Sequence, residues 1–283
     1  MGDDGAQRAV DRAHCPALTT MSGPRPEEVL MPQRLRLVGI MLMVFGLVFF
    51  IGSGVAFSMY QDGKHSLQSF SEVQGVELSY NEDGQLVDRG DTAAADGIMT
   101  MLTDEWGYPV SDREMDPDDP LVNTASEYMY QMATITHHVI DGTYPITLTE
   151  DALVDPDGNA LTELQVGDQT LAVPDPFPAE GWTVEYDGGG RYWQDFDRTN
   201  PADAAAREAM WTGTVHGLVG ELGVGTVTAS ALKLALGMVA LLAGLGAINL
   251  LTGAGLFWAA GARRAGETVP PSPVEQPELE RIG

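Results

Sequence analysis

The chain has 283 residues and a formal net charge of −26, from 41 acidic residues against 15 lysines and arginines. A chain this acidic repels phosphate, which excludes nucleic acid as an expected partner. It holds a single cysteine, Cys15, which excludes a disulfide within the chain. A halophilic, generally acidic composition is an alternative explanation of the charge.

The negative charge is concentrated in the middle of the chain. Residues 61–230 carry 32 acids and six bases, a net of −26, whereas the rest of the chain carries nine of each. Two long apolar runs flank this segment. The balanced ends argue against a generally acidic composition, and we expect one acidic α+β domain over 61–230, large enough for its own core.

Residues 1–33 are rich in glycine, proline and charge and show no apolar period. We expect a disordered cytoplasmic tail here. Alternatively, the first residues lie upstream of a start at Met21 or Met31 rather than Met1.

The apolar run from Leu37 to Met59 predicts a transmembrane helix over 34–60. About 20 apolar residues cross a hydrocarbon layer of about 30 Å. The run is longer than the roughly 7 to 15 apolar residues of a signal peptide, so an uncleaved signal anchor is favoured over cleavage near Ala56.

The second apolar run, Ala231 to Ala260, predicts a transmembrane helix over 231–262, followed by a disordered, proline-rich tail over 263–283. The arginines that flank the two runs are Arg34, Arg36, Arg263 and Arg264. Lysine and arginine mark the cytoplasmic flanks of membrane spans. We therefore expect a cell-membrane protein with both termini cytoplasmic and the acidic domain extracytoplasmic.

Small residues recur at helical spacing within both predicted spans. They are Gly39, Gly46 and Ser53 in the first, and Gly237, Ala240, Gly244 and Ala247 in the second. Such stripes let helix backbones approach closely in lipid. We expect the helices to pack on each other, on another membrane protein or on a second copy, unless Gly and Ala are simply common in membrane helices. Asn249 should bond a protein group, most simply a backbone carbonyl.

The sequence of the central domain predicts mainly helices in its first half and mainly short strands in its second half. We expect a hairpin over 68–89, a helix over 91–106 and a loop over 112–120. Thr124 and Glu127 fit a capping box at the start of a helix that ends before Gly142.

The second half of the domain changes to β-prone segments. Runs at 146–149, 161–166, 170–173 and 183–186 predict a small antiparallel sheet. A last helix opens at Asn200, whose cap is followed by a proline. This helix is expected to lie on the domain or the membrane surface, or to continue into the second span.

The capped helix carries the main candidate chemistry. Residues Tyr130, Thr134, His137 and Asp141 share one face of it, with His138 beside them. A carboxylate one turn from an imidazole stabilises the cationic imidazole, which suits proton handling or metal binding. The alternative is a solvated helix surface whose terminal histidines complement the helix dipole.

Copper is the transition metal to consider, because soft thioethers and imidazoles suit it and Met132 accompanies His137 and His138. The alternative for the methionines is core packing. Residues 155–159 begin like a calcium loop, but Ala160 and Val166 stand where an EF-hand has Gly and Glu. A β-turn is therefore favoured over calcium.

No nucleophile elbow, zincin helix or phosphate loop is present in the sequence. We therefore expect a non-catalytic accessory or scaffold subunit of a cell-envelope membrane complex, although dispersed catalytic residues remain compatible with the sequence. One alternative is a copper-binding extracytoplasmic domain that uses His137 and His138. Another is an extracellular sensor that signals through a partner.

Overall fold

The computed structural model describes residues 26–155 and 158–267. The chain divides into two units, residues 1–52 with 242–283 and residues 53–241. Most of the two predicted tails, residues 1–25 and 268–283, lies outside the described residues, as do residues 156 and 157 of the possible calcium loop.

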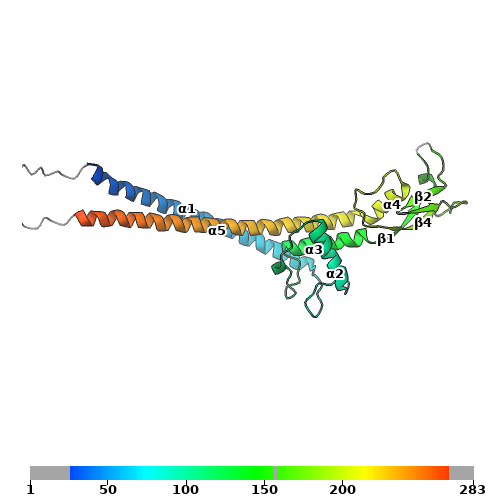
Figure 1. Cartoon of the computed structure of the whole chain (residues 1–283), viewed down its shortest axis with the longest axis horizontal. Coiled ribbons are helices and arrows are strands. Elements are labelled where there is room, and N and C mark those ends of the chain that lie inside the picture. Colours follow the sequence, from blue (N-terminus) through cyan, green and yellow to red (C-terminus); the bar gives the residue numbers. More distant parts are fainter. Residues whose placement is uncertain (1–25, 156–157, 268–283) are drawn as a thin grey trace, which may run out of the picture. The chain divides into compact units, whose positions relative to one another are not determined.

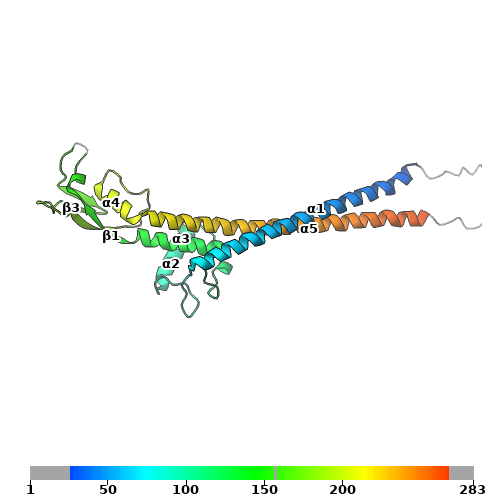
Figure 2. The ribbon, with the colours of Figure 1, turned by 180° about the vertical axis from the view of Figure 1, so that it is seen from behind.

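Two long helices, α1 (Pro26–Gln74) and α5 (Gly213–Glu267), each contribute one part to each unit (Figures 1 and 2). Each contains an apolar stretch long enough to cross a membrane. Only 11% of that stretch in α1 and 6% in α5 is buried. A core helix of a soluble protein would be mostly buried, so the exposed apolar surface is compatible with a membrane location.

Both helices extend beyond the predicted spans. Helix α1 continues from the apolar run to Gln74 and ends at Gly75, which takes a left-handed φ of +60°. The prediction of a hairpin from residue 68 is therefore wrong for its first residues. Helix α5 begins at Gly213, well before the predicted start of the second span.

Within the first unit, α1 and α5 pack through glycines. A Cβ atom on Gly46 would lie 2.9 Å from the carbonyl oxygen of Gly246, and one on Gly39 would lie 2.8 Å from that of Gly253. Real Cβ contacts are longer than this. The two backbones therefore approach as closely as they do because the side chains are missing.

The second unit also contains three shorter helices, each with an N-cap residue whose side chain accepts a backbone N–H of the first turn. They are α2 (Thr92–Thr100), α3 (Ala125–Ile140) and α4 (Pro201–Met210), capped by Asp91, Thr124 and Asn200. A single π-helical turn, η1 (Met101–Glu105), extends α2. Short 3₁₀ turns, η2 (Asp112–Glu114) and η3 (Glu150–Ala152), lie before α3 and after the first strand.

The strands form two separate antiparallel pairs rather than the one small sheet predicted. Strand β1 (Thr143–Leu148) pairs with β4 (Trp182–Asp187), and β2 (Glu163–Val166) pairs with β3 (Gln169–Ala172). In β1 and β4 the buried residues alternate with exposed ones, so one face of this pair covers the core.

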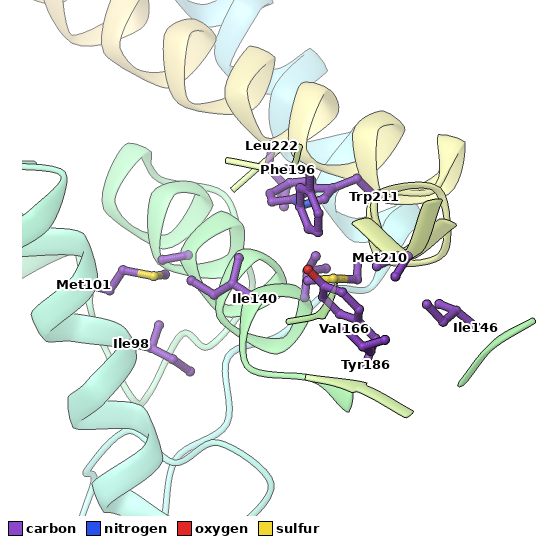
Figure 3. Close-up of a cluster of buried hydrophobic side chains, with 14 of the residues drawn as sticks. Ile98, Met101, Ile140, Ile146, Val166, Tyr186, Phe196, Met210, Trp211 and Leu222 are labelled. Carbon is purple, nitrogen blue, oxygen red and sulfur yellow. The ribbon is translucent and has the colours of Figure 1, made fainter. Parts of the chain in front are cut away.

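A single core joins these elements in the second unit. Figure 3 shows side chains from α2, η1, α3, the strands, α4 and α5 directed toward one another. Tyr186 is fully buried; its hydroxyl donates to the Asp203 carboxylate at 2.8 Å and accepts from the Arg191 guanidinium at 2.8 Å. These bonds fasten β4 to α4 without leaving the buried hydroxyl unsatisfied.

Candidate functional site

Helix α3 positions most of the predicted site residues. Its capping box forms as the sequence predicts: the Thr124 hydroxyl accepts the Glu127 N–H, and the Glu127 carboxylate accepts the Thr124 N–H at 2.8 Å. Burial raises the pKa of Glu127 above its ordinary value, and the bonds donated by Asn123 and Thr124 offset this only in part.

His138, at the end of α3, is paired with the loop that follows α1. Its Nε2 lies 2.8 Å from Oδ2 of Asp88, a carboxylate only 13% exposed. The guanidinium Nη2 of Arg89 lies 3.4 Å from Nδ1 of the same ring. Both nitrogens of the imidazole therefore have partners.

His137 has a carboxylate of its own, because its Nδ1 lies 2.9 Å from Oδ2 of Asp141. The rings of His137 and His138 are 6.1 Å apart, centre to centre. Met132 is only partly buried and packs against the core. Within the described ranges, no group of three His, Cys, Asp or Glu side chains is arranged to hold a metal ion.

The polar face predicted on α3 is not uniformly solvated. Tyr130 is only 3% exposed, and its hydroxyl has no hydrogen-bond partner among the described residues. Burial raises the pKa of Tyr130, with the nearby Asp88 adding to the effect. Burial likewise raises the pKa of Tyr80 to about 12, and this hydroxyl also has no partner in the part of the chain that the structure describes. The pattern missed this because α3 is packed on more than one side.

A cavity of about 360 Å³ brings part of the predicted site together. Tyr130, Thr134 and His138 line it with Asp88 and Arg89, two residues the sequence did not single out. Residues His137, Asp141 and Met132 do not line it. The Thr134 hydroxyl donates to the Tyr130 carbonyl oxygen at 3.0 Å. Because Asp88 and Arg89 both bond to His138, these three side chains fasten the loop after α1 to the end of α3.

The small residues of the two spans are placed differently. Gly39, Gly46 and Ser53 face α5, and the Ser53 hydroxyl donates to the Val239 carbonyl oxygen at 3.0 Å. Gly237 and Gly244 have open space where a Cβ would stand. Ala240 is exposed and Ala247 partly exposed, whereas Asn249 donates to the Leu245 carbonyl oxygen at 2.8 Å. Within the first unit, the face of α5 that meets α1 carries Gly246 and Gly253.

The possible calcium loop makes its own turn. The carboxylate of Asp155 accepts the Asn159 N–H at 2.8 Å and its side-chain amide at 3.0 Å. The Gly158 N–H also donates to the Asp155 carbonyl oxygen at 2.9 Å, which is the backbone bond typical of a β-turn.

A polar cluster near the start of the second apolar run was not found from sequence. Glu114 accepts the N–H and the hydroxyl of Ser126 and forms an ion pair with Lys233. Burial alone would raise the pKa of Glu114, but the contacts with Lys233 and Ser126 together hold that pKa below its ordinary value. The only signal in the sequence was the lone lysine in an apolar run.

Comparison with known proteins adds no relative: no family model, curated protein or solved structure matches this chain.

Proposed function

We propose that the protein is a non-catalytic, two-span accessory or scaffold subunit of a cell-envelope membrane complex. In this proposal α1 and α5 cross the lipid bilayer, both termini are cytoplasmic and the acidic domain is extracytoplasmic. The flanking arginines support the orientation, because positive charge is retained on the cytoplasmic side.

The observation that carries the proposal is an uncharged, exposed seam on α5. Its residues step by four and three: Gly213, Gly217, Gly220, Val224, Val227, Ala231, Leu234, Met238 and Leu241. All are exposed, with Val224 at 67%, Val227 at 69% and Leu234 at 73%. Alternating steps of four and three are the spacing of helices that wrap around one another.

The outer part of this seam is the informative part. Lipid accounts for apolar residues within the span, but Val224 and Val227 precede the Ala231 start of the apolar run. They lie on a domain with 32 acids, yet no charged residue interrupts the seam. An apolar stripe kept free of charge beyond the membrane favours contact with another helix, from a second copy or from another membrane protein.

Cysteine cross-linking tests the proposal. Replacing Cys15 with Ser removes the only native thiol, and Val227→Cys then places one on the seam. Glu72→Cys, an exposed position on α1, is the matched control. Oxidation or a short thiol cross-linker in intact membranes should give a covalent dimer or a discrete adduct from Val227→Cys alone. Monomer from both variants counts against the proposal.

A metal-binding role is the second candidate, favoured by the adjacent His137 and His138 rings. Copper would have to displace the carboxylates that now pair with each imidazole and recruit a thioether such as Met132. Elemental analysis of the purified chain tests this role. Stoichiometric copper that is lost in His137→Ala/His138→Ala would support it, and equal metal content in both proteins would end it.

A further inference from the structure

A cavity of about 330 Å³ lies between α1, α3 and α5 within the second unit. Its walls are apolar side chains, chiefly Phe70 of α1, Ile135 of α3, and Leu218 and Leu222 of α5. Phe70 is 46% exposed and Leu218 is 41% exposed, so apolar surface continues to the opening. This cavity lies outside the α5 seam, and it shares Gln131 and Ile135 with the lining of the cavity at His138.

The floor of the cavity offers no polar atom in need of a partner. The Ser71 hydroxyl donates to the Leu67 carbonyl oxygen at 3.0 Å and lies 2.8 Å from the Tyr128 hydroxyl. Ser71 has one proton to donate, so Tyr128 donates to Ser71. Both hydroxyls are then satisfied, and the interior presents hydrocarbon rather than a polar site that would hold water.

The floor is also rigidly placed. A Cβ atom on Gly225 would lie 2.6 Å from the Tyr128 ring, so α5 contacts that ring directly. Together with the bond to Ser71, this contact holds Tyr128 between the two long helices. The cavity is therefore a preformed feature of the three-helix contact.

The size of the cavity limits what can enter. At about 30 Å³ for each water-sized group, 330 Å³ holds about eleven such groups. This corresponds to one aliphatic chain of about ten carbons, and it is too small for two long chains.

The opening selects the head group. Gln74, Gln131 and Glu221 are the long polar side chains of the lining, and within residues 26–155 and 158–267 no lysine, arginine or histidine lines the cavity. Glu221 is exposed and carries the one ionisable carboxylate there, in a domain whose net charge is −26. An anionic head group would be repelled, whereas an uncharged or cationic one can bond to the amides and the carboxylate.

We propose that this cavity binds a single-chain amphiphile of about ten carbons with an uncharged or cationic head group. The chain lies against Phe70, Ile135 and Leu222, and the head group lies at Glu221. The proposal does not depend on the scaffold function, because the walls of the cavity are not residues of the α5 seam.

Photolabelling of the full chain in lipid nanodiscs tests the site without competing detergent. The probes are a ten-carbon monoacylglycerol and decanoate, each with a diazirine at the end of the chain. Label on α3 is measured by mass spectrometry of its peptide. Because α3 lies outside both apolar stretches, label there reports the cavity rather than the bilayer. The monoacylglycerol, an uncharged ester, should label α3 about tenfold more than the anionic decanoate does.

Two variants make the test specific. Ile135→Trp fills the cavity and should lower α3 labelling about tenfold, whereas Val154→Trp, at a position 44% exposed elsewhere in the unit, should not. Glu221→Lys, on the surface, should raise decanoate labelling to at least that of the ester.

Absence of α3 label with the ester overturns the proposal, as does unchanged label in a folded Ile135→Trp. Equal labelling by decanoate in the unmodified chain overturns the charge selection. Should Ile135→Trp fail to fold by circular dichroism, Glu221→Lys decides: an unaltered probe preference counts against the site. The cross-linking result at Val227 is independent of all these outcomes.

Discussion

The carboxylate of Glu114 forms an ion pair with the ammonium group of Lys233, the lone charge of the second apolar run. The two partners come from η2 and from α5, which are far apart in sequence. Ser126, at the start of α3, adds two hydrogen bonds to the same carboxylate. This pair therefore ties the η2 loop and α3 to the long helix at the point where its apolar run begins.

Lys233→Met should lower the stability of the second unit modestly. The lysine side chain is 57% exposed, so solvent screens the pair, and we expect a loss of about 1 kcal/mol. The loss should shrink as pH falls. The pKa of Glu114 is below its ordinary value, so its contribution is full above the unfolded pKa and disappears as pH falls through the folded pKa. Tryptophan fluorescence during urea unfolding at several acidic pH values measures this. A loss that grows on acidification contradicts the assignment.

The stability associated with Glu127 depends on pH in the opposite direction. Burial raises its pKa, so the stability associated with it is present below the unfolded pKa and is lost as pH rises through the folded pKa. Glu127→Gln keeps a side chain that caps the helix but removes the buried charge, and should be at least as stable as the native chain at neutral pH. Glu127→Ala loses the cap and should cost about 1 kcal/mol. Equal destabilisation by both substitutions, measured by urea unfolding, would show that the charge itself is needed.

Two tyrosines of α3 form a matched pair. Tyr128 and Tyr130 are 5% and 3% exposed, but among the described residues only the Tyr128 hydroxyl has a partner, Ser71 at 2.8 Å. Tyr128→Phe should cost about 1 kcal/mol, because it removes that bond and leaves Ser71 with one partner fewer. Tyr130→Phe removes a buried hydroxyl without a partner and should be neutral or stabilising. Thermal unfolding followed by circular dichroism ranks the two, and the reverse order would contradict the hydrogen bonding described.

The sequence predicts features that depend on local chemistry. The capping box of Thr124 and Glu127 and the Asn200 cap with Pro201 form because a few adjacent residues decide them. Likewise, the two long apolar runs are helical because composition alone sets their character. These features need no knowledge of distant contacts.

Contacts between distant segments were not predictable in the same way. The strands were placed nearly correctly, but their division into two pairs depends on which partner each strand meets, and periodicity does not specify that. Tyr130 was assigned to a polar face because one helix period cannot show that α3 is packed on more than one side. Asp88, Glu114 and Lys233 acquire their roles only through partners far along the chain.

Substitution of Gly225 and, as a control, of Gly223 by alanine tests the contact between α3 and α5 on which the amphiphile cavity depends. A methyl group on Gly225 would lie 2.6 Å from the Tyr128 ring, whereas one on Gly223 would meet nothing within 4 Å. Gly225→Ala should therefore cost about 1 to 3 kcal/mol through overpacking. Gly223→Ala should gain about 0.5 to 1 kcal/mol from helix propensity. Urea unfolding of the two variants separates these effects, since a gain from both would mean that the Tyr128 ring does not press on α5. In that case the cavity floor would be mobile, and Gly225→Ala would leave amphiphile labelling of α3 unchanged.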